Sequence, residues 1–275
     1  MHPCCNRQIV AVLVIVLTAN WAHAQESSPP ASIVHSGEDT IVKADAARPL
    51  AAALGVIAEQ YGWKVDYEDP VYANGEAKDA SVPEWRKQHP ESKGVLIPSG
   101  GVFFANLGRI SSTNPDERSV LEMLVQAYNS SANPGYFTLI ETPNHRFCIR
   151  GSSRSPSSSK STQIFDELIQ VKSEQQSGLD ALQELTSHCA TNTPIELGLV
   201  PSNSLSQTTI KGYTELLSCR ERLGRILSAM PSNLIYDLFY DIGSKSYYLS
   251  IVPAHRVIIG SDGKEIRVPL APPAP

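Results

Sequence analysis

The change of residue pattern between residues 49 and 68 constrains the fold of this chain most strongly. In its first part the large apolar residues recur four, three and four positions apart, at helical spacing: Leu50, Leu54, Ile57 and Tyr61. Pro49 suits the first turn of such a helix, and Gly62 suits the position after its last turn. Apolar and charged residues then alternate from Trp63 to Glu68, which predicts a strand with one buried face. The stretch therefore predicts a helix that leads directly into a half-buried strand.

The rest of the first half extends this pattern. Strands are expected at residues 40–45 and 101–107, and a hairpin at residues 136–150. Between them, a second helix is expected to start at Asn114, which can cap it, with Glu117 placed as the acid of a capping box. The predicted order of the half is β-α-β-β-α-β-β.

The second half repeats this order. Helices are expected where apolar residues recur from Leu179 to Cys189 and from Leu223 to Met230. Strands are expected around them, at residues 168–172, 195–199, 207–213 and in a hairpin over 234–252. An internal duplication explains both halves with one rule, and the alternative is two generic α+β halves whose order agrees by chance. A last hairpin, at residues 256–268, is expected to complete or cover a sheet edge.

These patterns predict an α+β protein made of two tandem βαββαββ modules. The modules are separated by a serine-rich linker that has no apolar periodicity, and the first contains a polar insertion broken by two prolines. The expected divisions are a signal peptide at 1–24, a first module at 25–150 with its insertion at 73–94, a linker at 151–162, a second module with the terminal hairpin at 163–268, and a proline-rich tail at 269–275.

The N-terminal segment predicts export. An apolar run from Ile9 to Leu17 follows Arg7, and small residues ending at Ala24 provide a cleavage site. The run is shorter than the roughly 20 residues that span a bilayer. The alternative is an uncleaved anchor. We expect a periplasmic or secreted protein that is cleaved near Ala24 and has no transmembrane segment in its mature form.

The charge of the mature chain argues against nucleic-acid partners. The whole sequence has a net charge of −5, and loss of Arg7 with the signal peptide makes it −6. A mildly acidic surface does not favour binding to nucleic acid or to anionic lipid. With 41% hydrophobic and 19% charged residues, the chain is expected to fold around a sizeable core.

One stretch resembles a known family. The residues that carry the likeness lie between Thr40 and Tyr67: Pro49, Leu50, Ala53, Leu54, Ile57, Ala58, Gly62, Val65 and Tyr67. They resemble the short N-terminal signalling domain of secretins and TonB-dependent receptors. The resemblance implies a βαββαββ fold and a role as a docking module in the periplasm. Two features depart from those families, because the insertion at 73–94 is foreign to the domain and no plug, barrel or pore sequence follows.

The cysteines of the mature chain suggest a disulfide. Cys189 ends the first predicted helix of the second module and Cys219 begins the second helix, so both are expected at the same end of the module. A bond between them would close a loop of about 30 residues and contribute roughly 3–4 kcal/mol. The alternative is two separate buried thiols. Cys148 lies in a predicted strand and is expected to be a core thiol.

No catalytic, cofactor-binding or metal-binding residues are identified from the sequence. His188 and Cys189 point about 100° apart on a helix, which is unsuitable for a nucleophile and its base. The other histidines lack metal-ligand spacing, and residues 98–101 lack the spacing and lysine of a phosphate-binding loop.

The insertion offers a different kind of site. Trp85 lies beside Arg86 in a polar stretch, and exposed tryptophan next to arginine is typical of contact hot spots. The alternative is that Trp85 pins the insertion to its module. The leading hypothesis is a non-enzymatic adaptor or assembly module that docks on another protein of the bacterial envelope through exposed strand edges. The alternatives are an exported hydrolase and a small-ligand binding protein, each with a site between the modules.

Overall fold

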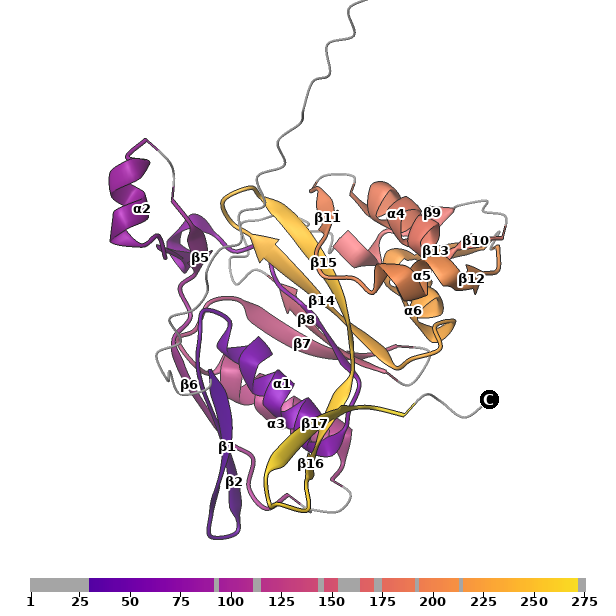
Figure 1. Ribbon diagram of the computed structural model, residues 1–275. Helices are drawn as coiled ribbons and strands as arrows, with labels where there is room; N and C mark the ends of the chain where they lie inside the picture. The colour runs from indigo at the N-terminus through magenta and orange to yellow at the C-terminus, as the bar shows by residue number, and fades with distance from the viewer. Residues whose placement is uncertain are drawn as a thin grey trace, which may run out of the picture.

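The computed structural model describes residues 30–91, 94–110, 115–142, 146–152, 164–170, 175–190, 193–212 and 215–271. The predicted signal peptide, the expected cap Asn114 and most of the serine-rich stretch lie outside these ranges. Within them the chain is mixed α+β, with six α-helices and several small sheets (Figure 1).

The first half contains two helices that contact two sheets. Its elements are β1 (Ala31–Ser36), β2 (Asp39–Asp45), α1 (Pro49–Tyr61), β3 (Val65–Glu68), β6 (Val102–Asn106), α3 (Glu117–Asn129), β7 (Tyr136–Glu141) and β8 (Phe147–Ser152). β1, β2 and β6 form one antiparallel sheet, while β3 runs parallel to β8, which pairs antiparallel with β7. One hydrophobic core joins both sheets to α1 and α3.

The boundaries of α1 follow from its terminal residues. Pro49 occupies the first turn, where its missing N–H costs nothing. Gly62 ends the helix in the left-handed region at φ 71°, and its N–H bonds to the carbonyl of Ala58. The residues expected on the apolar stripe are buried except Tyr61, which lies at the helix end.

The insertion folds as a projecting arm (Figure 1). It consists of η1 (Asn74–Glu76), β4 (Ala77–Asp79), α2 (Pro83–Gln88) and β5 (Leu96–Pro98), in which β4 and β5 pair antiparallel. The six-residue α2 stands at the outer end of the arm, away from both cores.

The second half begins after the serine-rich stretch, of which Gly151 and Ser152 still belong to β8. Its elements are η2 (Ile164–Asp166), β9 (Leu168–Gln170), β10 (Gln176–Ser177), α4 (Gly178–Cys189), β11 (Ile195–Leu197), α5 (Ser202–Gln207), β12 (Thr209–Ile210), β13 (Leu216–Ser218), α6 (Cys219–Ser228), β14 (Leu234–Asp241) and β15 (Ser246–Pro253). β11 runs parallel to β15, which pairs antiparallel with β14. This is the pairing pattern of β3, β8 and β7 in the first half.

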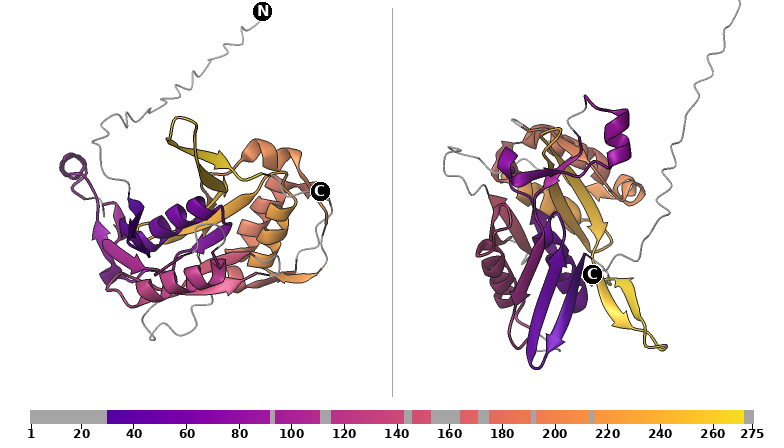
Figure 2. Two further views of the ribbon diagram at one scale, coloured as in Figure 1. Left: turned by 90° about the horizontal axis from the view of Figure 1, so that it is seen from below. Right: turned by 90° about the vertical axis from the view of Figure 1, so that its left-hand side faces the viewer.

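The terminal hairpin differs from the expectation that it would complete or cover a sheet edge. β16 (His255–Ile259) and β17 (Glu265–Pro269) pair only with each other among the described strands. The hairpin packs instead on α1, where Arg267 forms an ion pair with Glu59, and it stands out from the body in Figure 2. It therefore covers one end of a helix.

The two halves share one six-stranded sheet. Its order is β11-β15-β14-β3-β8-β7, and the halves meet where β14 runs parallel to β3. The core around α4 and α6 lies on one face of this sheet, and the core around α1 and α3 lies on the other (Figure 1). The two predicted modules therefore do not have separate sheets, although each half has its own helices and its own hydrophobic core.

This arrangement also corrects the prediction for β3. The alternation of apolar and charged residues predicted one buried and one solvated face, but all four residues of β3 are buried. Asp66 and Glu68 face the core of the second half. Three buried acids, Asp66, Glu68 and Asp69, consequently lie where the two halves meet.

Candidate functional site

The junction between the halves is the candidate site, because buried charges, a charged groove and the apolar groove gather there. Each half covers only one face of its own three strands with helices, and the two halves cover opposite faces. On the face of the shared sheet that its own helices do not cover, each half therefore leaves strand residues near the junction without a helix from the same half. One of these faces is highly charged and the other is mainly apolar.

Arg146 neutralises the first buried acid. Its guanidinium donates two hydrogen bonds to Asp66, with N···O distances of 2.5 and 3.2 Å. The same carboxylate accepts the backbone N–H of Tyr236 on β14 at 3.0 Å. Burial raises the pKa of Asp66, while the charge and hydrogen bonds of Arg146 oppose that rise.

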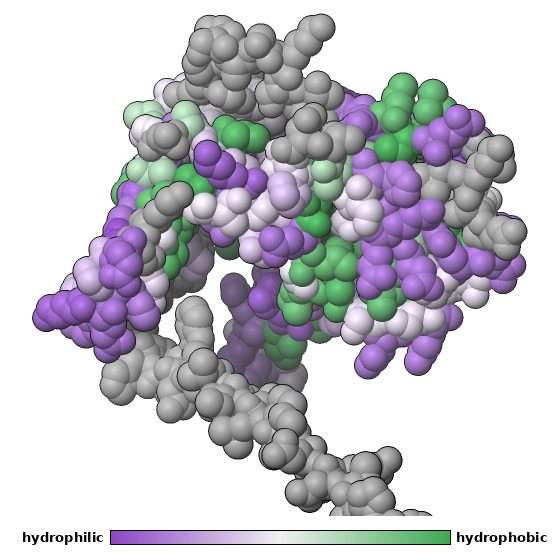
Figure 3. Space-filling view, turned by 90° about the horizontal axis from the view of Figure 1, so that it is seen from above, coloured by the Kyte–Doolittle hydropathy of each residue, from purple (hydrophilic) through white to green (hydrophobic). Residues whose placement is uncertain are grey.

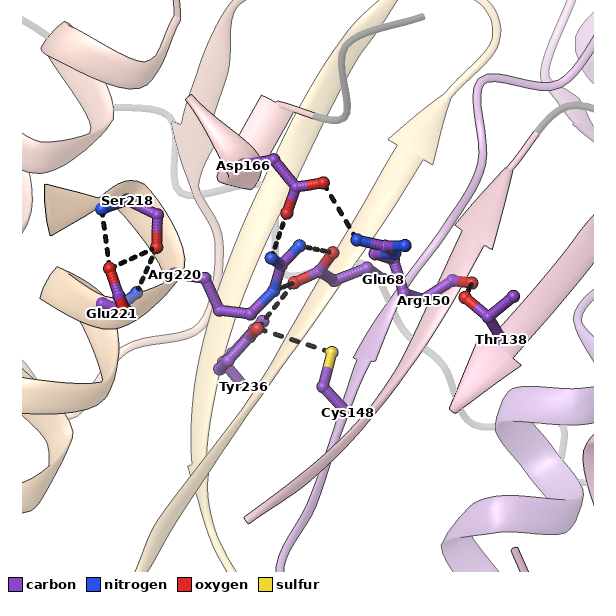
Figure 4. A network of polar contacts seen from close by, with 9 residues as sticks. All are labelled: Glu68, Thr138, Cys148, Arg150, Asp166, Ser218, Arg220, Glu221 and Tyr236. Carbon is purple, nitrogen blue, oxygen red and sulfur yellow. Dashed lines mark hydrogen bonds and ion pairs between the residues drawn. The ribbon is translucent and has the colours of Figure 1, made fainter. Parts of the chain in front are cut away.

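Glu68 is the centre of a larger network (Figure 4). Arg220, from the first turn of α6, donates to both carboxylate oxygens at 2.8 and 2.7 Å and also bonds Asp166. The hydroxyl of Tyr236 donates to Glu68 at 2.6 Å, and Arg150 donates to Asp166 at 2.9 Å. The network thus joins β3 and β8 of the first half to η2, α6 and β14 of the second.

Asp69 closes the junction at the other end of β3. It accepts from Arg48 at 2.6 Å, from the hydroxyls of Tyr67 and Tyr72, and from the backbone N–H of Tyr240 at 3.0 Å. Arg48 also donates to the carbonyl of Tyr240 at 2.8 Å. The backbone pairing of β3 with β14 covers only Asp237 and Leu238 of β14. The carboxylates of Asp66 and Asp69 extend this pairing at both ends, because they accept the backbone N–H groups of Tyr236 and Tyr240.

These groups are suited to holding the halves together rather than to catalysis. Each of Asp66, Glu68 and Asp69 is buried and paired with an arginine, so these three carboxylates lack the accessible, unengaged oxygen that a general base needs. The thiol of Cys148 is fully buried and contacts the Tyr236 hydroxyl at 3.6 Å. Burial, together with the charge of Glu68, raises the pKa of this thiol well above its ordinary value, which disfavours the nucleophilic thiolate.

A charged groove of about 490 Å³ lies beside this network, between the end of β7 and α6. Arg146 and Arg225 line it together with Glu141 and Glu221. Opposite charges are therefore interspersed along its walls, so the groove does not present a field of one sign to a charged ligand. Its hydroxyl-bearing residues are Thr142, Ser218 and Tyr236, and its lining contains no histidine among the described residues.

The apolar groove lies on the other face of the sheet and has a volume of about 730 Å³. Its floor is formed by Ile235, Phe239 and Val252 of β14 and β15, and one wall is α1. Asp237 lies in the middle of this floor, between Ile235 and Phe239. Among the described residues the Asp237 carboxylate has no hydrogen-bond or ionic partner, although Arg48 contributes to the same lining.

The environment of Asp237 changes its acidity. Burial, followed by the negative charges of Asp66 and Asp69, raises its pKa to about 7. A carboxyl group with this pKa is partly protonated at neutral pH. A cation placed in the groove would stabilise the ionised form of this carboxyl group.

A recess of about 560 Å³ continues this surface toward the arm. It shares Arg48 and Phe239 with the groove and is otherwise bounded by residues 94–97 and by the turn between β14 and β15. Figure 3 shows the molecule hollowed between the projecting arm and the main body, with apolar side chains on part of the wall.

The residues singled out in the sequence lie at two other places. Trp85 and Arg86 lie on α2, where the ring of Trp85 contacts that of His89 at 4.9 Å and Arg86 pairs with Asp79. Both side chains are partly exposed, and α2 does not pin the insertion to either core. Cys189 and Cys219 form a disulfide in the core of the second half, with their Cα atoms 6.1 Å apart.

The described histidines do not gather at one site. His35, His89 and His188 are exposed on separate elements, and His255 lies at the hairpin end of the apolar groove. His145 lies outside the described residues. No group of three His, Cys, Asp or Glu side chains in the described ranges could hold a metal ion.

In the part of the chain that the structure describes, no helix has the length and apolar character needed to cross a membrane. Comparison with known proteins found no matching family model, no similar curated protein and no similar solved structure.

Proposed function

We propose that the chain is a non-enzymatic adaptor or assembly module of the bacterial cell envelope, exported by its N-terminal signal and acting by docking another protein. The observation that carries this proposal is the apolar groove beside α1, which none of the described residues covers. Half-buried Ile235, Phe239 and Val252 form its floor, and a concave apolar surface beside a helix is a recurring kind of peptide-binding site.

The repeated strand pairing supports the two-module part of the proposal. β3, β8 and β7 are connected and paired in the same way as β11, β15 and β14, and each set follows the same helix–strand order. From β2 onward and without the arm, the order of the first half matches the βαββαββ order of the signalling domain that residues 40–67 resemble, and β1 is an additional strand before it. We propose tandem modules of this type, fused edge to edge into one platform.

The structure favours the groove over the edges of the six-stranded sheet as the place of docking. On β7, the side-chain amide of Asn129 already bonds both the N–H and the carbonyl of Phe137, at 2.9 and 2.7 Å. On the opposite side, β11 has only three residues. Short or blocked edges are devices that prevent strand addition.

A small-ligand binding protein is the second candidate, since the groove has the volume of ligand pockets. A ligand-dependent rise in melting temperature would support it, provided that filling the groove abolishes the rise. The hydrolase alternative has less support. His255 and Asp237 line the same groove, but its described lining contributes no hydroxyl or thiol that could act as a nucleophile.

The proposal is tested by filling the groove. Gly55 lies on the groove wall, and a Cβ there would meet no atom within 4 Å, so Gly55→Trp adds bulk without displacing the backbone. Gln60→Trp places the same side chain on an exposed part of α1 that does not line the groove. Affinity-tagged exported protein is purified in the two variants and the wild type.

If the chain docks through the groove, an envelope protein should co-purify with the wild type and with Gln60→Trp but not with Gly55→Trp. Equal recovery in all three forms would place docking elsewhere. Repeated recovery of nothing by any form would remove the support for an adaptor.

A further inference from the structure

The apolar groove has the width of one helix. Its floor consists of β14, β15 and the chain at Leu199, which continues past β11 and accepts the N–H of Ile251 on β15 at 2.7 Å. Three adjacent chains span about 10 Å at roughly 4.8 Å per strand. An α-helix with its side chains has a diameter of about 10–12 Å. On the first-half strands of the same face, α1 and α3 already lie side by side against the sheet. The strip that no described residue covers is the position that the next helix of that layer would occupy.

The wall of the groove is suited to close helix packing. The residues that α1 contributes to it are mostly small: Ala51, Ala52, Gly55 and Ala58, with Leu54 behind them. Helix axes pack 8–10 Å apart, at the shorter end of this range when the contact residues are small. A helix in the groove would therefore contact α1 and the sheet at the same time.

The charge in the floor specifies the polarity of the occupant. Asp66 and Asp69 are the charges that act on Asp237 from β3 and the residue after it. The other charged and titratable groups that line the groove are Arg48 before α1, Glu59 on α1, and His255 and Arg267 on the hairpin. Arg48 is bound to Asp69, and Arg267 is bound to Glu59. Both arginines of the groove are thus paired with other acids, and the carboxylate of Asp237 has no cationic partner among the described residues.

We infer that this groove binds an amphipathic helix of another protein, whose apolar face carries one Lys or Arg that pairs with Asp237. The inference rests on the proposed docking function and names the partner's chemistry. Apolar residues three and four apart on that helix would cover Ile235, Phe239 and Val252. The basic residue gives specificity, because a helix without it would bury an uncompensated carboxylate.

The experiment is a selection of helical peptides on the full mature protein. The probe is a phage-displayed library of 18-residue peptides, built on an alanine and glutamate helix framework, with six positions randomised along one face. Selection on the wild type is compared with selection on Gly55→Trp and on Gln60→Trp. Selected peptides are then synthesised, and their dissociation constants are measured at pH 8, where the carboxylate of Asp237 is ionised.

We expect peptides with an apolar stripe and one central Lys or Arg to be enriched on the wild type and on Gln60→Trp, but not on Gly55→Trp. Replacing the basic residue by norleucine should weaken binding at least tenfold. Asp237→Asn should remove that difference, because the pairing partner is gone, and should leave the binding of the norleucine peptide at least as tight.

Three results would overturn the inference. The first is enrichment without any preference for a basic residue, and the second is a preference that persists in Asp237→Asn. The third is a groove occupied by a second copy of this chain, seen as a concentration-dependent rise in molar mass that Gly55→Trp abolishes. The docking function itself would survive the first two results if the co-purifying protein still depended on an open groove, so the two failures are distinguishable.

Discussion

The buried pair of Glu68 and Arg220 provides a quantitative test of the junction. The Glu68 side chain is 5% exposed and that of Arg220 is 9% exposed, and two N–H···O bonds of 2.8 and 2.7 Å join them. Arg220→Met keeps most of the side-chain volume but leaves the carboxylate buried without its cation. Breaking a buried ion pair from one side costs about 3–5 kcal/mol.

Two variants set the scale for this measurement. Arg109→Met removes a cation from the pair with Glu38, in which both side chains are more than 70% exposed, and should change the stability by less than about 0.5 kcal/mol. The double variant Glu68→Gln with Arg220→Met removes both charges and should recover most of the loss, because neutral replacements of buried pairs are often tolerated.

The assay is urea unfolding at pH 7, followed by tryptophan fluorescence and by circular dichroism. The reasoning would be refuted if Arg220→Met cost less than about 1 kcal/mol, or no more than Arg109→Met. If the double variant does not recover stability, the destabilisation of Arg220→Met comes from lost packing and not from the uncompensated charge of Glu68.

Three further predictions concern single positions. Because the pKa of Asp237 in the fold, about 7, exceeds its ordinary value of 3.8, its contribution to stability is present below about pH 4 and is lost as the pH rises through 7. Asp237→Asn should therefore be more stable than the wild type at pH 8, by up to about 4 kcal/mol, and equally stable near pH 3; a thermal or urea series over pH that shows no such convergence would contradict the assignment. Reducing the bond between Cys189 and Cys219, which are 30 residues apart, should lower the unfolding free energy by about 3–4 kcal/mol, measured by urea titration with and without reductant. Gly151→Ala should lower the unfolding free energy by at least about 2 kcal/mol, since its Cβ would lie 2.3 Å from the backbone nitrogen of Pro70. Gly55→Ala, in contrast, should stabilise α1 by roughly 0.5–1 kcal/mol, because its Cβ would meet no atom within 4 Å. Equal melting temperatures for the two variants would be inconsistent with the close approach of β8 to Pro70.

Local patterns were sufficient to predict most helices and strands. The apolar stripe with Pro49 and Gly62 defined α1 to the residue, because those signals act within the helix itself. The same approach missed α5, whose six residues contain one apolar side chain, Leu205. It also placed the start of α3 at Asn114, whereas the helix begins at Glu117, with Asp116 in the N-cap position.

The junction could not be predicted from local patterns. Asp66 and Glu68 have the spacing of a solvated strand face, and the arginines that neutralise them lie 80 and 152 residues away in the sequence. One signal was present in the second half. Arg220 and Arg222 lie in the first turn of α6, where the helix dipole disfavours cations, and both side chains are buried. Buried arginines at that position indicate acidic partners from elsewhere in the fold.

The groove depends on the same non-local pairing. Asp237 and Phe239 alternate with buried residues along β14, as they would on any strand with one exposed face. Only the parallel pairing of β14 with β3, at Asp237 and Tyr67, brings this face next to α1. A sequence pattern describes the two surfaces separately but does not show that they form one groove.

The most direct test of the account is photo-crosslinking from inside the groove in living cells. A benzophenone amino acid placed at Ala52, on the groove wall, is compared with one at Gln60 on the exposed part of α1. The account predicts a discrete crosslinked envelope protein from position 52 alone, attached through a helical segment that contains a basic residue. Crosslinks of equal yield from both positions, or none from position 52 while the protein still recovers its partner, would contradict it.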